Sequence, residues 1–224
     1  MLIFWERRLV VLSQQKTGTS ALIHALASRA DMFIKQPSAL RHMKHAEFCN
    51  FICPMFQKKV GAGREAFQVV SVMREPIDWI GSWYRFRARD ELADTAHPQH
   101  SEYTGAMSFD QFVRDVCARN VKPIPRHAAI STPLGVATSP DGLLAVDRLF
   151  PYEDLSGFHA LIEEVTGEPV KTIPVNVSPT IELKLSEEPR LALQNLLRNE
   201  IELHAALKAN GEIDPHFRTM KFLV

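Results

Sequence analysis

The chain has few cysteines and no long apolar run. Its 224 residues include three cysteines, which are too few for the disulfide framework of a small secreted protein. Cys49 and Cys53 stand four residues apart, without the spacing of a standard zinc site, so we expect small packing residues and no metal centre. No stretch approaches the ~20 apolar residues of a membrane span, and the first residues lack the pattern of a signal peptide. We therefore expect a cytoplasmic protein that does not span a membrane.

The chain also lacks an excess of charge of either sign. Lys and Arg together number 26 and so do Asp and Glu, so no overall field would recruit nucleic acid or an anionic membrane. The hydrophobic share of 46% and the charged share of 23% are ordinary for a globular protein, and the length suits a single domain spanning 1–224. Any anion site must therefore be local, which suits a small phosphorylated ligand better than a polymer.

Residues 9–26 have the pattern of a buried strand, a polar turn and a helix. Residues 9–13 are apolar and rich in β-branched side chains, and 19–26 alternate small and apolar residues with helical spacing. Gly18 can adopt backbone angles that other residues resist. A turn of this kind directs unpaired backbone N–H groups and the positive end of a helix dipole at one point, and Lys16 adds a full charge. The expected guest is a phosphate-like anion.

This turn differs from the standard nucleotide-phosphate loop, G-x-x-x-x-G-K-[ST]. No glycine opens it, and Lys16 precedes Gly18 instead of following a glycine. The difference disfavours an ordinary ATPase, GTPase or kinase.

A second strand-to-helix stretch runs over 67–87. Arg74 stands at the end of an apolar strand, where open α/β sheets bind their ligands. Pro76 suits the first turn of the following helix, and Ser82 lies eight residues beyond Arg74, roughly two turns along. A guanidinium at the strand end and a hydroxyl on the next helix can reach the same anion.

The two stretches together resemble the sulfotransferases that use 3′-phosphoadenosine 5′-phosphosulfate (PAPS), most closely the carbohydrate-type and bacterial members. The motifs are Q-K-T-G-T-S at Gln15–Ser20 and R-E-P-x-x-x-x-x-S-x-Y beginning at Arg74. The resemblance implies a P-loop-like, three-layer α/β fold with a central, mainly parallel sheet flanked by helices. It implies that a phosphosulfate loop is formed by Gln15, Lys16, Thr17, Gly18, Thr19 and Ser20, and that the 3′-phosphate is held by Arg74 and Ser82.

The resemblance also implies a catalytic base after the second strand. His42, His45 and Glu47 all lie in that part of the chain. Histidine titrates near pH 6.5, which suits a base that takes a proton from an acceptor hydroxyl, and some carbohydrate-type members use a glutamate. The sequence leaves the choice among these three open.

The implied reaction moves a sulfuryl group from PAPS to a hydroxyl or amine of an acceptor, a carbohydrate being one candidate, and releases 3′,5′-ADP. Lys16 would neutralise charge on the leaving oxygen, and the scheme needs no metal. Two other functions stay open, a P-loop kinase-like enzyme and a catalytically inactive nucleotide-binding or scaffold protein. The sequence does not identify the acceptor.

The remaining segments give weaker expectations. An apolar stripe predicts a C-terminal helix over about 186–209, as a brace or a homodimer interface. Residues 121–141 form either a lid or a disordered loop. Arg85, Arg87 and Arg89 either contact an anionic acceptor or form the solvated face of a helix.

One further feature of the family is found in this chain, and another is not evident. Asn176 and Ser178 resemble an N-x-S stretch that lies near the nucleotide in related enzymes. The family's glycine-rich basic segment is not evident in the tail 217–224.

Overall fold

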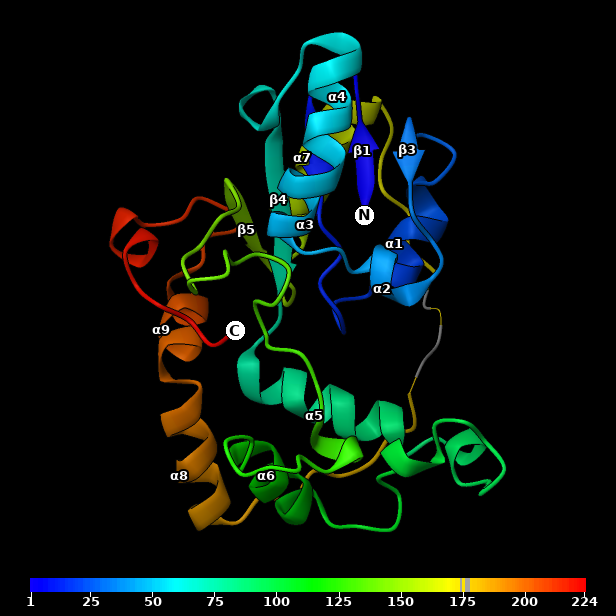
Figure 1. Ribbon diagram of the computed structural model, residues 1–224, viewed down its shortest axis with the longest axis vertical. Helices are drawn as coiled ribbons and strands as arrows, with labels where there is room; N and C mark the ends of the chain where they lie inside the picture. The colour runs from blue at the N-terminus through cyan, green and yellow to red at the C-terminus, as the bar shows by residue number, and fades with distance from the viewer. Residues whose placement is uncertain (174, 176–177) are drawn as a thin grey trace.

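The protein is built on a five-stranded sheet, seen in a computed structural model that describes residues 1–173, 175 and 178–224 (Figure 1). The strands lie in the order β3-β1-β2-β4-β5. Their bounds are Leu2–Phe4 (β1), Leu9–Val11 (β2), Met32–Phe33 (β3), Gln68–Met73 (β4) and Arg148–Pro151 (β5). The predicted α/β class is confirmed.

The sheet is mixed, so the prediction of a mainly parallel sheet is wrong. Strands β2, β4 and β5 run parallel, whereas β1 pairs antiparallel with both β2 and β3. The reason is the short turn between β1 and β2, in which the Arg8 N–H donates to the Trp5 carbonyl at 3.1 Å. A connection of this length can join only antiparallel strands, because a parallel crossover needs a dozen or more residues.

Helices cover both faces of the sheet, an arrangement compatible with a three-layer α/β fold. The helix bounds are Thr19–Leu26 (α1), Ser38–Arg41 (α2), His45–Glu47 (α3), Cys53–Val60 (α4), Pro76–Arg87 (α5), Phe109–Cys117 (α6), Ser156–Thr166 (α7), Glu187–Leu196 (α8) and Arg198–Ala206 (α9). Helices α1 and α7 pack on one face through Leu22, Ile23 and Phe158, and α4 packs on the other through Phe56 (Figure 1).

Shorter helical segments connect these elements. A π-helical segment, Phe48–Ile52, leads directly into α4. Short 3₁₀ turns occur at Arg64–Ala66, Asp90–Leu92, His100–Glu102, Arg126–Ala128 and Pro215–Arg218.

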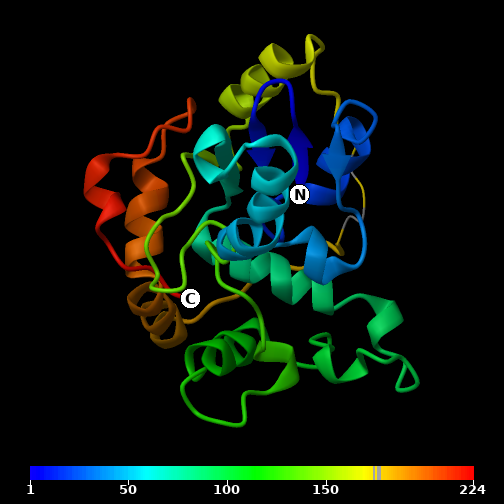
Figure 2. The ribbon, with the colours of Figure 1, turned by 45° about the horizontal axis from the view of Figure 1, so that its top comes forward.

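A separate apolar cluster lies beyond the carboxyl ends of the parallel strands. Trp79 of α5 and Phe112 of α6 are fully buried there, together with Leu193 of α8. Figures 1 and 2 both place α5 and α6 below the sheet, with α8 and α9 along one side. Helix α5 therefore forms the floor beneath the strand ends.

The predicted C-terminal helix over about 186–209 is two helices, α8 and α9, separated by Leu197. Leu193 of α8 packs with α5 and α6, whereas Leu203 of α9 packs with the core of the sheet. The pair thus links the two apolar clusters, as a brace would. Its use as a dimer interface stays a prediction.

The part 132–138 of the segment 121–141 is packed against the sheet, which contradicts the disordered alternative for this part, whereas 121–127 are exposed or half-buried. Leu134, Val136 and Ala137 are buried in the main core. This segment runs directly behind the polar turn that follows β2. None of the helices in the described part of the chain has the length and apolar character that a membrane span requires.

Candidate active site

The polar turn after β2 is held in a conformation that presents the start of α1. Lys16 and Gly18 both have positive φ angles, 64° and 67°, and Gly18 caps α1. The Thr17 hydroxyl donates to the Gln14 carbonyl at 2.8 Å, which closes the turn. The N-terminal N–H groups of α1 and the positive end of its dipole therefore face the ligand edge of the sheet.

Segment 121–141 and helix α5 fix the turn from behind. The buried Gln14 side chain donates to the Thr132 carbonyl at 2.9 Å and accepts from the Val136 N–H at 3.1 Å. The Gln15 carbonyl accepts from the Trp79 indole N–H at 2.8 Å. The Ser131 hydroxyl donates to the Gln15 side-chain oxygen. The turn is thus preorganised before any ligand arrives.

Arg74 brings the second predicted motif to the first. It follows β4 directly, and its Nη1 donates to the Lys16 carbonyl at 3.2 Å. Its Nε donates to Asp78 at 2.6 Å, and its guanidinium lies 4.9 Å from the centre of the Tyr152 ring. The parallel pairing of β2 and β4 explains this proximity, because it places their carboxyl ends at one edge.

Both motifs line one cavity of about 960 Å³. All six residues of Gln15–Ser20 lie in its wall, together with Arg74 and Ser82. The cavity extends from α1 and α2 across α5 to α7, and its other cationic lining residues are Arg41, Arg85, Arg87 and Arg89. Positive charge is therefore concentrated in this cavity although the whole chain has none in excess.

Lys16 is the most strongly perturbed group in the cavity wall. Burial, followed by the charges of Arg89 and three further arginines, lowers the pKa of its ammonium from 10.5 to about 7. Its Nζ lies 3.8 Å from the centre of the Phe86 ring and 5.6 Å from that of Trp83. These cation–π contacts offset part of the cost of holding the charge there.

His42 lies in the same cavity with one defined tautomer. Its Nδ1 is 2.7 Å from the Ser13 carbonyl, and because a carbonyl oxygen only accepts, Nδ1 carries the proton. The Nε2 lone pair is then available as a base. Burial lowers the pKa of His42 below 6.5, as do the nearby Arg41 and Lys16, while the Ser13 bond opposes this change. The ring is therefore neutral at pH 7.

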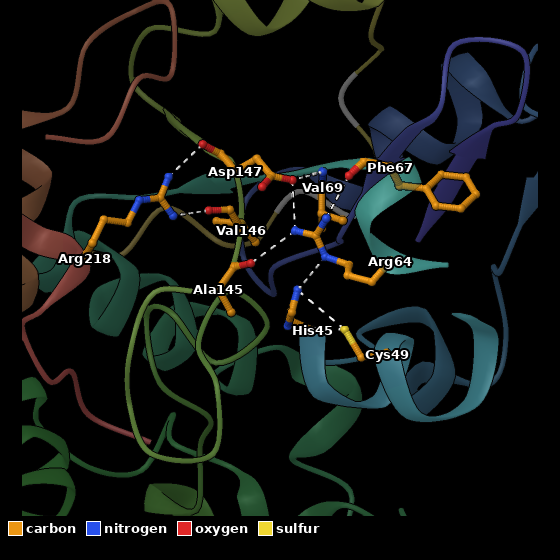
Figure 3. Close-up of polar contacts among 9 residues, drawn as sticks. All are labelled: His45, Cys49, Arg64, Phe67, Val69, Ala145, Val146, Asp147 and Arg218. Carbon is orange, nitrogen blue, oxygen red and sulfur yellow. Dashed lines mark hydrogen bonds and ion pairs between the residues drawn. The ribbon is translucent and has the colours of Figure 1, made fainter. Parts of the chain in front are cut away.

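The other two predicted bases lie outside the cavity wall. Figure 3 shows His45 beside Arg64, whose Nε donates to His45 Nε2 at 3.0 Å and whose Nη2 pairs with Asp147 at 2.9 Å. The Glu47 carboxylate accepts the Lys44 N–H at 2.7 Å and so caps α3. The structure thus brings His42, but not His45 or Glu47, to the polar turn that follows β2.

The cavity contains three residues that the sequence reasoning did not select. Arg41 of α2 donates to the Ser20 hydroxyl at 3.2 Å, Tyr152 lies beside Arg74, and His159 of α7 has a buried Nε2 without a partner among the described residues. Tyr152 directly follows β5, whose apolar residues Leu149 and Phe150 were a usable signal. His159 had none, because a lone polar residue on a helix is ordinary.

Two further predictions concern ligands at the margins of the site. Ser178 lines the cavity, whereas Asn176 lies outside the described residues.

No group of three or more His, Cys, Asp or Glu side chains is placed to hold a metal ion within residues 1–173, 175 and 178–224. Cys49 contacts His45, with its Sγ 3.7 Å from the ring nitrogens (Figure 3).

No protein-family model, curated protein or solved structure matches the chain. The chemistry of the cavity is therefore the guide to function. It combines the start of a helix, five arginines, a lysine that titrates near neutral pH and a neutral histidine. Such a set suits a ligand with several anionic groups and a reaction in which a proton is removed.

Proposed function

We propose that this protein is a PAPS-dependent sulfotransferase of P-loop-like fold, acting on a hydroxyl or amine of an acceptor such as a carbohydrate. The observation that carries the proposal is the 3.2 Å contact between the Arg74 guanidinium and the Lys16 carbonyl. It joins the two predicted anion motifs in one cavity, whose volume of about 960 Å³ is in the range of small-molecule and cofactor sites.

In this proposal the chain grips the donor at both ends. The N–H groups at the start of α1, with the hydroxyls of Thr19 and Ser20, hold the 5′-phosphate. Arg74 and Ser82 hold the 3′-phosphate, the group that distinguishes PAPS from ATP. His159 also lines the cavity, and its buried Nε2 has no hydrogen-bond partner among the described residues. Buried nitrogens normally have such a partner, so in this proposal a polar atom of the ligand supplies it.

His42 is the proposed base. Its Nε2 takes the proton of the acceptor hydroxyl while the acceptor oxygen forms a bond to sulfur. The bond between sulfur and the bridging phosphate oxygen breaks, and 3′,5′-ADP leaves. Lys16 and the amides of the turn stabilise the charge that develops on the bridging oxygen. His45 and Glu47 take no part, since both are engaged away from the cavity.

Calorimetric titrations with 3′,5′-ADP and with ATP and Mg²⁺ test the proposal. We expect tighter binding of 3′,5′-ADP, and transfer of label from PAPS to a member of an acceptor panel. A preference for ATP would instead support a kinase-like enzyme. Binding of neither nucleotide would support a scaffold protein.

A further inference from the structure

Two buried donors near the C-terminal end of α5 lack partners. They are Trp83 Nε1 and Arg87 Nε, and no acceptor for either exists among the described residues. Arg87 is only 4% exposed, and its terminal nitrogens are already used by Glu102 and by the carbonyls of 126, 127 and 129. Its guanidinium lies 5.0 Å from the centre of the Trp83 ring. Buried donors of this kind call for an explanation.

Two cations lie beside these donors, against a single aromatic ring. Lys16 Nζ is 3.8 Å and the Arg89 guanidinium 4.0 Å from the centre of the Phe86 ring. Arg89 pairs with Glu91 at 3.2 Å, but the Glu91 side chain is 59% exposed, and such exposed pairs contribute little. Trp83, Arg87, Phe86 and Arg89 all line the cavity. We call these four residues the α5 wall. Its groups that lack a strong partner are two hydrogen-bond donors, Trp83 Nε1 and Arg87 Nε, and the positive charge of Arg89.

This wall extends from the proposed 3′-phosphate site, where Ser82 directly precedes Trp83, to a point beyond the C-terminal end of α5. Arg74 precedes the first residue of α5, whereas Arg89 follows its last residue. A helix of 12 residues is about 18 Å long, at 1.5 Å per residue. A 3′-phosphate held by Arg74 and Ser82 therefore borders Trp83 but lies farther from Arg87 and Arg89, which follow Ser82 by five and seven residues, about 7.5 and 10.5 Å along the axis.

We propose that Trp83, Arg87 and Arg89 form an oxyanion site for the acceptor, so that the acceptor carries a carboxylate or a sulfate ester besides its reacting hydroxyl. This proposal rests on the proposed sulfotransferase function. The oxyanion accepts from Trp83 Nε1 and Arg87 Nε and pairs with Arg89. Lys16 lies at the border of the site and serves the donor.

The experiment compares pairs of acceptors of similar size, one anionic and one neutral. With 3′,5′-ADP bound at saturation, 4-hydroxybenzoate is titrated against its neutral analogue 4-hydroxybenzamide, and glucuronate against glucose. We expect the anionic member of at least one pair to bind about tenfold more tightly, as one charge-assisted hydrogen bond provides.

Two variants test which residues bind the oxyanion, and the measured quantity is the ratio of the affinity for the anionic probe to that for its neutral analogue. Trp83→Phe removes the indole N–H together with part of the ring but keeps an aromatic side chain. Arg89→Met removes the charge but keeps a similar stem. Each variant should bring the ratio close to one. Arg114→Met is the matched control, because Arg114 also forms an exposed ion pair, with Glu188, but lies outside the cavity wall. Its ratio should equal that of the wild type.

The outcomes separate the two proposals. If 3′,5′-ADP does not bind at all, the sulfotransferase function fails. If 3′,5′-ADP binds but neither anionic probe is preferred over its neutral analogue, the oxyanion site is overturned and the transferase stands. A preference that survives in both variants would also overturn the site, as would competition between the anionic probes and 3′,5′-ADP.

Discussion

Lys16 should make donor binding depend on pH between 7 and 9. Burial and the charges of Arg89, Arg74, Arg85 and Arg87 lower the pKa of its ammonium to about 7, so the side chain loses its charge over this range in the free protein. An anionic ligand restores the charge, because it favours the ammonium form. Binding above pH 7 should therefore take up a proton.

The size of the effect follows from linkage. A ligand that binds only the ammonium form loses a factor of ten in affinity for each pH unit above the pKa, about 1.4 kcal/mol per unit. At pH 7 about half of the side chains are charged and at pH 9 about one in a hundred, so the loss over this range is about fiftyfold. Other groups do not mimic it, because phosphate has its second pKa near 6 and the pKa of His42 lies below 6.5.

The assay is calorimetric titration of 3′,5′-ADP at pH 7, 8 and 9, in two buffers that differ in ionisation enthalpy. The difference between buffers gives the number of protons taken up. Lys16→Arg is the control, since arginine stays charged throughout and should give a flat profile. An affinity independent of pH in the wild type, or equal proton uptake in Lys16→Arg, would refute the reasoning.

The same lysine should also affect the stability of the free protein. Its folded pKa of about 7 lies below the value of about 10.4 expected for an unfolded chain, so the unfolded state binds more protons between these pH values. The free energy of unfolding should therefore rise with pH from 7 towards 10, and the cost of burying the charge is present in full below pH 7. Urea unfolding of Lys16→Met should lack this rise.

Three further predictions concern other residues. His42→Ala should lower kcat by about 10²- to 10⁴-fold, whereas His45→Ala should leave turnover nearly unchanged; equal losses in a labelled-PAPS assay would remove His42 as the base. Arg74→Ala should weaken 3′,5′-ADP by about 1.5–3 kcal/mol but leave 5′-AMP unaffected in the same titration. Glu200 is 1% exposed, and burial raises its pKa, so wild-type stability should fall as pH rises through that pKa. Glu200→Gln should abolish this fall in urea unfolding at pH 5 and pH 8.

The two motif regions could be predicted from the sequence because their signals are local. An apolar run, a polar turn with Gly18 and a helical pattern give β2 and α1, and a similar run ending at Arg74 gives β4 and α5. The antiparallel strand β1 could not be predicted. With three residues it shows no periodicity, and its pairing depends on the turn to β2 and on contact with β3.

The choice among three candidate bases could not be made from the sequence, because it depends on side-chain partners far along the chain. His42 and His45 lie three residues apart, yet one bonds the Ser13 carbonyl and the other accepts from Arg64. The backbone N–H of His45 also donates to the Val136 carbonyl at 2.9 Å. Segment 121–141 thus helps to fix α3 at a position from which His45 does not reach the cavity wall.

The same segment explains why the solvated-face interpretation of the α5 arginines is wrong for Arg87. Carbonyls of 126, 127 and 129 surround its terminal nitrogens, and Glu102 adds a carboxylate at 2.9 Å. Arg85, two residues earlier, shares Asp78 with Arg74 instead. Three arginines at alternate positions therefore have different surroundings, because each meets a different segment brought in by tertiary packing. Helical spacing alone gives the direction of a side chain, but the segment packed against the helix decides whether its charge is buried, paired or left to a ligand.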